Sequence, residues 1–216
     1  LADLDKNLRE LGSGLLVLEG KPELEIPKIV QQFKATKVFA KREVSYEEKQ
    51  TEALVQNALF KLKCELLTFS TSTLYHAEDL PFSIKDIPDV FTNFRKKTEK
   101  DAIIREAFDA PTEIRSPEIP LLFLPSLEEL NLTFTPIDSR AVLPFKGGET
   151  EVIARLNHYF FETNCISEYK ETRNGLIGAD YSSKFSPWLA MGCISPRFIN
   201  YELKKQADTT RNAFIL

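Results

Sequence analysis

The sequence has few of the residues that build metal centres and disulfides. Its 216 residues include only two histidines and three cysteines, Cys64, Cys165 and Cys193, which lie far apart. An odd number of scattered cysteines excludes a disulfide framework and a CxxC zinc site, and two lone histidines add no metal site. We expect buried thiols, which predicts an intracellular, reducing compartment.

Long apolar runs and a large excess of either charge are also absent. No stretch approaches the ~20 apolar residues that span a bilayer, so no membrane span is expected. The formal net charge of −4 argues against nucleic-acid binding through net charge, although it leaves room for a local basic groove. With 43% hydrophobic residues, the chain can bury a substantial core.

The distribution of glycine and proline divides the chain. All eight glycines lie within 12–20 and 147–192, and six of the twelve prolines lie between Pro111 and Pro144. A proline-rich stretch without glycine is typical of a connector that runs over a surface. We therefore divide the chain into residues 1–108, a connector at 109–148, and residues 149–216.

The first part alternates between helical spacing and short apolar runs. The apolar runs predict buried strands at 15–18, 38–40 and 66–69, and helical spacing predicts helices over 1–11, from Pro22 to about Phe33, and from about 46 to 62. This alternation implies parallel pairing with right-handed crossovers, hence a doubly wound, Rossmann-like α/β fold. Because no strand precedes the helix at 1–11, we expect the sheet to be incomplete, with further strands before residue 1.

After residue 145 the pattern is helical throughout. Apolar residues recur at a spacing of three to four from Val152 to Phe160, around Trp188, and from Phe198 to Leu203. No strand pattern interrupts them. Residues 149–216 therefore predict the first helices of an all-α domain.

A polar loop rich in hydroxyl groups leads into one of these helices. Pro187 suits the first helical turn and Ser186 the N-cap position. The hydroxyls of Ser182, Ser183 and Ser186, free amide groups and Lys184 would then form an anion site at the helix start. The same residues also suit a surface loop before a well-capped helix, and the residues alone leave both interpretations open.

Four motifs resemble the photolyase/cryptochrome family, most of all the DASH-type cryptochromes. They are Tyr169–Gly175 (YKETRNG), Lys184–Arg197 (KFSPWLAMGCISPR), Pro88–Lys96 (PDVFTNFRK) and Lys146–Glu149 (KGGE). The similarity extends from residue 1 to about Lys205. It implies an α/β antenna domain, truncated at its N-terminus, followed by the start of a helical FAD-binding domain.

The resemblance also implies the roles of particular residues. It assigns binding of the FAD pyrophosphate and ribityl chain to the loop and to an aromatic residue beside it: Tyr169, Ser182, Ser183, Lys184, Phe185 and Ser186. Small hydroxyls and backbone amides suit a diphosphate because they allow close approach. Arg173 matches a position near the DNA backbone, where a guanidinium can contact phosphate in a bidentate manner, although an exposed loop arginine is the alternative.

The implied activity is that of a deoxyribodipyrimidine photolyase. The family consists of blue-light flavoproteins that repair cyclobutane pyrimidine dimers, in single-stranded DNA for the DASH branch, with FAD and a 5,10-methenyltetrahydrofolate antenna. Family members are more than twice this length. We therefore expect an incomplete folate site and no repair by this chain alone.

Two other functions are compatible with the same residues. One is a non-catalytic fragment or partner-binding module. The other is an unrelated nucleotide-binding α/β protein of the electron-transfer-flavoprotein type, against which the helical second part argues.

Overall fold

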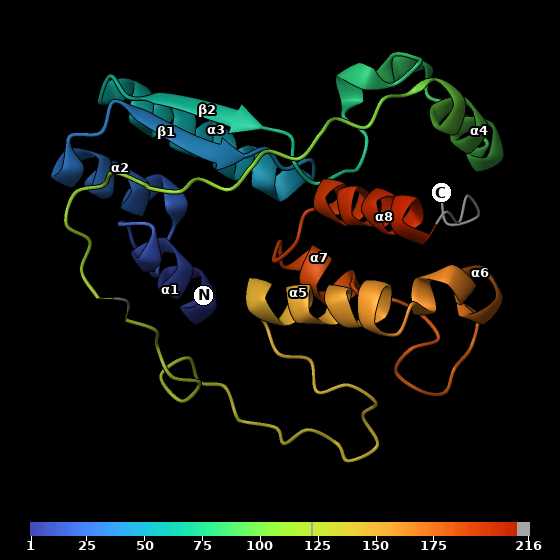
Figure 1. Ribbon diagram of the computed structural model, residues 1–216. Helices are drawn as coiled ribbons and strands as arrows, with labels where there is room; N and C mark the ends of the chain where they lie inside the picture. Colours follow the sequence, from blue (N-terminus) through green and yellow to red (C-terminus); the bar gives the residue numbers. More distant parts are fainter. Residues whose placement is uncertain (122, 211–216) are drawn as a thin grey trace.

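The computed structural model describes residues 1–121 and 123–210, with an α/β part followed by a group of helices (Figure 1). The α/β part contains the elements α1 (Ala2–Glu10), α2 (Pro22–Phe33), β1 (Lys37–Lys41), α3 (Tyr46–Lys61), β2 (Glu65–Phe69) and α4 (Phe91–Asp101). These bounds confirm the predicted helices at 1–11, 22–33 and 46–62 and the predicted strands at 38–40 and 66–69.

The two strands pair in parallel, with Val38 opposite Leu66. A parallel pair needs a crossover, and α3 supplies it. Helices α2 and α3 pack on the face of the sheet that carries Val38 and Leu66, and the buried residues of this first core are Val30, Val55, Leu59 and Cys64. The described chain thus contains an incomplete parallel α/β sheet, as predicted.

The predicted strand Leu15–Leu18 does not form. Residues 13–19 have no strand ladder, and the amide of Leu15 donates to Asp5 Oδ1 on α1 at 2.8 Å instead of to another strand. An apolar run becomes a strand only beside a partner strand, and within residues 1–121 and 123–210 the only sheet is the β1–β2 pair. Periodicity alone could not supply that information.

A long connector leads from α4 back past α1 to the helical part (Figure 1). Residues 102–148 contain no helix or strand among those described. The connector is held to the end of α1, where the amide of Ile114 donates to the Leu11 carbonyl at 2.7 Å and Arg9 donates to the carbonyl of Ile119 at 3.0 Å. No helix in the described chain is long and apolar enough to cross a membrane.

The helical part contains α5 (Glu149–Asn157), α6 (Tyr169–Thr172), α7 (Ser186–Ala190) and α8 (Pro196–Thr210). A π-helical turn at His158–Glu162 extends α5. These elements bury a second core made of Val152, Leu156, Tyr159, Phe160, Phe185, Trp188 and Ile194. The helices predicted after residue 145 from the apolar spacing are therefore confirmed.

Candidate functional site

The hydroxyl-rich loop lies beside a cleft of about 460 Å³ between α6, α7 and α8. The lining residues are Tyr169, Ser182, Ser183, Lys184, Phe185, Ser186, Leu189, Pro196 and Ile199. The structure thus brings all six of the residues predicted to bind the cofactor to one cleft.

The predicted N-cap at Ser186 is displaced by one residue. Helix α7 begins at Ser186, its N-cap is Phe185, and no side chain caps it. The ring of Phe185 is buried and lies 6.0 Å from that of Phe160, so core packing rather than a hydroxyl fixes the entry into this helix. The Ser186 hydroxyl is therefore not used in capping.

The loop makes its hydrogen bonds through carbonyl groups. The carbonyls of Ser182 and Ser183 accept from a guanidinium behind the loop. Among residues 1–121 and 123–210, the hydroxyls of Ser182, Ser183 and Ser186 have no hydrogen-bond partner, and all three line the cleft. Unpaired hydroxyls around one opening can donate to an anionic ligand.

Lys184 adds positive charge at the edge of the cleft. Its backbone is left-handed, with φ of 58°, and its Nζ lies 3.6 Å from the centroid of the Tyr181 ring. This cation–π contact restrains the side chain beside the loop. Lys184 thus lines the same cleft as the three serines.

The guanidinium behind the loop belongs to Arg155 of α5, a residue that no motif in the sequence singled out. Its side chain is 7% exposed and forms an ion pair with Asp180, with 2.7 Å between Nη1 and Oδ1. A sequence signal existed, because Arg155 lies between Val152 and Leu156 on the apolar stripe of the predicted helix. A charged residue in such a position must find partners when it is buried.

Asp180 connects this arginine to a histidine. Burial raises the pKa of Asp180, but hydrogen bonds from Arg155 and His158 outweigh that effect and leave the pKa below its ordinary value. His158 Nε2 lies 3.2 Å from Asp180 Oδ2, and its Nδ1 lies 3.4 Å from Glu162 Oε2. The carboxylate thus remains charged beside Arg155.

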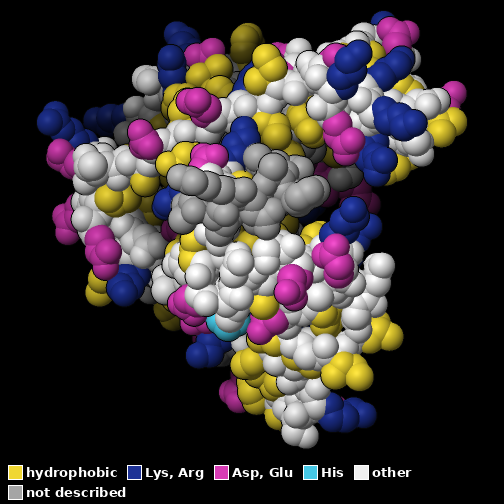
Figure 2. Space-filling view, turned by 45° about the vertical axis from the view of Figure 1, so that its right-hand side comes forward, with side chains coloured by type: hydrophobic (Ala, Val, Ile, Leu, Met, Phe, Trp, Pro, Cys, Tyr) yellow, Lys and Arg dark blue, Asp and Glu magenta, His cyan; other side chains and the backbone are white. Residues whose placement is uncertain are grey.

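Arg173 lies apart from the cleft. It is exposed at the C-terminal end of α6 and does not line the cleft. In the view of Figure 2, basic side chains gather at the upper right with a few acidic ones among them, and elsewhere on this face the two signs are mixed. No group of three or more potential metal ligands occurs in the part of the chain that the structure describes.

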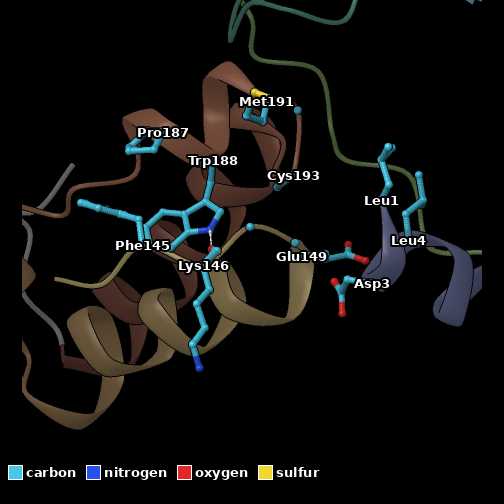
Figure 3. Close-up of a pocket in the computed structure, with 13 residues that line it drawn as sticks. Leu1, Asp3, Leu4, Phe145, Lys146, Glu149, Pro187, Trp188, Met191 and Cys193 are labelled. Atoms are coloured by element: carbon cyan, nitrogen blue, oxygen red, sulfur yellow. Dashed lines mark hydrogen bonds between the residues drawn. The ribbon is translucent and has the colours of Figure 1, made fainter. Parts of the chain in front are cut away.

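A second pocket, of about 390 Å³, lies where α1, the connector and α7 meet (Figure 3). The indole of Trp188 forms part of its wall, and its Nε1 donates to the Lys146 carbonyl at 2.8 Å. The carboxylate of Asp3 lies at the opposite wall, on α1. None of the predicted site residues lines this pocket, so we assign no cofactor to it.

Comparison with known proteins identifies the class. The DNA photolyase family pattern matches residues 1–115. A solved cryptochrome from Synechocystis sp. PCC6803 superposes with a TM-score of 0.90 at 47% identity, over 96% of this chain and 43% of that one. A class III photolyase from Agrobacterium tumefaciens shares the fold, with a TM-score of 0.76 at 22% identity. The chain belongs to the DNA photolyase family.

Within that family, the chain is similar to DASH-type cryptochromes over most of its length. Cryptochrome DASH of Danio rerio is 44% identical over 215 residues, which cover 97% of this chain and 41% of the relative. Cryptochrome DASH of Synechocystis sp. is 49% identical over 209 residues, which cover 94% and 42%. The chain therefore spans about two fifths of the length of these relatives. The resemblance inferred from the motifs is confirmed, and an unrelated α/β fold is excluded.

Proposed function

We propose that this chain is part of a DASH-type blue-light flavoprotein and that its cleft holds the diphosphate and ribityl chain of FAD. The observation that supports this proposal most directly is the group of unpaired hydroxyls of Ser182, Ser183 and Ser186 around one cleft, with Lys184 at its edge. Tyr169 contributes an aromatic wall on the side of α6.

The donor set fits a diphosphate. Phosphate oxygens need several donors, and small side chains allow the ligand to approach the backbone closely. An archaeal photolyase from Sulfolobus tokodaii, similar in fold with a TM-score of 0.61, was solved with two FAD molecules. When bound, FAD would supply the light-driven electron that splits a cyclobutane pyrimidine dimer. The residues of this chain would bind and orient the cofactor.

We further propose the division into an antenna domain at 1–108, a connector at 109–148 and a helical domain from 149. Two separate hydrophobic cores support it, one around Leu59 and the other around Leu156. The 5,10-methenyltetrahydrofolate antenna stays a prediction from the resemblance.

The FAD proposal is tested by replacing the three serines with alanine in the 216-residue chain. Charge-assisted hydrogen bonds contribute about 1.5–3 kcal/mol each, so we expect the triple variant to bind FAD at least about tenfold more weakly. Fluorescence titration of FAD measures the affinity, with Ser139→Ala on the connector as the control. Unchanged affinity in the triple variant would refute the site.

We propose that Arg173 contacts the phosphates of single-stranded DNA that contains pyrimidine dimers. Its exposure at the end of α6 supports this role. Losing one phosphate contact lowers the slope of log affinity against log salt by about 0.7 for single strands.

The change that tests this role is Arg173→Ala, measured by DNA binding at several salt concentrations. Arg115→Ala is the matched control, because Arg115 lies on the connector with its side chain 92% exposed. If the slope changes equally in both variants, or changes in neither, Arg173 makes no special contact with the DNA phosphates.

A further inference from the structure

The backbone of the hydroxyl-rich loop is held by one side chain from another element. Arg155 Nε donates to the carbonyl of Ser183 at 3.1 Å, and its Nη2 donates to the carbonyls of Ala179 at 2.9 Å and Ser182 at 3.1 Å. With the Asp180 carboxylate at 2.7 Å, one guanidinium binds four acceptors within five consecutive residues. The rigid fork of arginine suits this task, whereas a lysine presents a single point charge.

These bonds determine which way the peptide groups point. In a planar trans peptide the carbonyl and the following amide point in opposite directions. Because the carbonyls of Ser182 and Ser183 point toward Arg155, the amides of Ser183 and Lys184 point away from it. Neither amide has an acceptor within residues 1–121 and 123–210, and both residues line the cleft.

The loop thus has two electrostatically different sides. Its carbonyl oxygens are neutralised by a buried cation, and its amides remain free together with the serine hydroxyls. Left-handed backbone at Lys184, with φ of 58°, is typical of the turns in which successive amides bind an anion.

We propose that Arg155 is the positioning residue that shapes this loop for an anionic ligand. The inference rests on the proposed function where it concerns FAD, since that function supplies the ligand. Arg155 lies behind the loop and is not among the residues that line the cleft. Arg155 therefore acts by holding the loop in its conformation and does not itself contact a ligand in the cleft.

The first experiment needs no ligand. Backbone 15N order parameters are measured by NMR relaxation in the parent chain and in Arg155→Lys. We expect the order parameters of residues 180–184 to be about 0.85 in the parent, as in rigid backbone, and to fall below about 0.6 in the variant, because four hydrogen bonds to one guanidinium no longer hold the loop. The order parameters in α5 around Leu156 should stay the same. Equal order parameters of the loop in both chains would overturn the proposal.

The matched control is Arg9→Lys. Arg9 also binds loop carbonyls, those of Ile119 and Pro120, but it does so on the connector far from the cleft in sequence. A general loss of stability would lower the order parameters of residues 180–184 in both variants. A positioning role lowers them in Arg155→Lys alone.

The second experiment is FAD titration of the same chains. Only molecules with an ordered loop bind well, so affinity should fall about tenfold in Arg155→Lys and stay unchanged in Arg9→Lys. A less ordered loop with unchanged FAD affinity would overturn the positioning role. If the parent chain binds no FAD, the proposed function fails, and the order parameters alone decide whether Arg155 orders the loop.

If Arg155→Lys does not fold, Asp180→Asn decides. This change keeps the shape of the side chain and removes the charge that faces Nη1 of Arg155. We expect the order parameters of residues 180–184 to fall below those of the parent and the FAD dissociation constant to rise about threefold, because one of the four acceptors of Arg155 loses its negative charge. Parental behaviour in both measurements would overturn the proposal.

Discussion

At the scale of single residues, two polar groups buried in the helical part differ in their hydrogen-bond partners. Arg155 has every nitrogen of its guanidinium engaged by the loop. Tyr159, four residues further along the chain, is fully buried, and its hydroxyl has no partner in the described chain. Its ring contacts the arginine, with Arg155 Cζ 5.2 Å from the ring centroid. The aromatic ring rather than the hydroxyl therefore accounts for the packing of Tyr159.

We expect Tyr159→Phe to leave the fold intact and to raise the free energy of unfolding at neutral pH by about 1 kcal/mol. An unpaired buried hydroxyl is unfavourable by about 1–3 kcal/mol, and phenylalanine removes it while keeping the ring against Arg155. Chemical denaturation measures the change. A loss of more than about 2 kcal/mol would mean that the hydroxyl has an essential partner.

The same residue predicts a pH dependence at the alkaline end. Burial raises the pKa of Tyr159 from 10.0 to about 12. The folded state thus favours the neutral phenol, so this contribution to stability is complete below pH 10 and is lost as the pH rises toward 12. Stability measured from pH 9 to 12 should fall less steeply in Tyr159→Phe than in the parent chain. Parallel curves would assign the alkaline transition to other groups.

At the scale of elements, periodicity predicted what depends on local spacing. The helices that begin at Pro22 and near Tyr46 and the strands around Phe39 and Leu67 follow from apolar spacing, and all of them form. The prediction of a strand at Leu15–Leu18 was wrong, because a strand depends on a partner strand that apolar spacing cannot reveal. The fold class was therefore predictable, whereas the number of strands was not.

The candidate site was predictable to a similar extent. Motif resemblance gave six of the nine residues that line the cleft, since these six lie within one continuous loop and beside it, but it did not give Leu189, Pro196 and Ile199. It did not give Arg155, because three of the four acceptors of that residue are backbone carbonyls, which have the same chemistry in every sequence. The cap at Ser186 was displaced by one residue because burial of Phe185 decides where α7 begins.

Helix α7 depends on its contacts with other elements. It has five residues, too few for a stable isolated helix. Trp188 holds it, since the indole is buried, donates to the Lys146 carbonyl and meets the Phe145 ring edge-on at 5.1 Å between centroids. The cleft residue Ser186 is in the same helix, so the anchoring of Trp188 also affects the site.

We therefore expect Trp188→Phe to lower the free energy of unfolding by about 1–2 kcal/mol, because it removes the hydrogen bond and leaves the Lys146 carbonyl without its donor. Circular dichroism must follow unfolding, since Trp188 is the single tryptophan of the chain. Lys146→Ala keeps the carbonyl and is the matched control, with no expected change. Equal stability of the parent and Trp188→Phe would contradict this account.

At the scale of the whole molecule, helix α1 joins the α/β part to the helical part. Asp3 accepts from the Thr150 amide at 3.0 Å and from the Thr150 hydroxyl at 2.7 Å, in the first turn of α5. The amide hydrogen bond from Thr150 is the main reason that the pKa of Asp3 is lowered. Asn7 adds a hydrogen bond to Glu149 at 3.2 Å. These contacts join the beginning of the chain to a helix about 150 residues later.

The glycine pair before α5 makes this junction testable. Gly148 has φ of 106°, and a Cβ there would lie 2.8 Å from Asp3 Oδ2, whereas a Cβ on Gly147 would meet nothing within 4 Å. We expect Gly148→Ala to lower the free energy of unfolding by about 1–3 kcal/mol through backbone strain, with the contact in addition. Gly147→Ala should differ from the parent by less than about 0.5 kcal/mol.

A double-mutant cycle separates the two causes. In a background of Asp3→Gly, Gly148→Ala should be less destabilising than in the parent, because the contacts with the carboxylate and the Cβ of Asp3 are gone and only the backbone strain remains. Denaturant unfolding of the four chains gives the coupling. Zero coupling would show that the close approach of α1 to α5 at Gly148 does not contribute to the junction, and that the glycine is required for its backbone conformation alone.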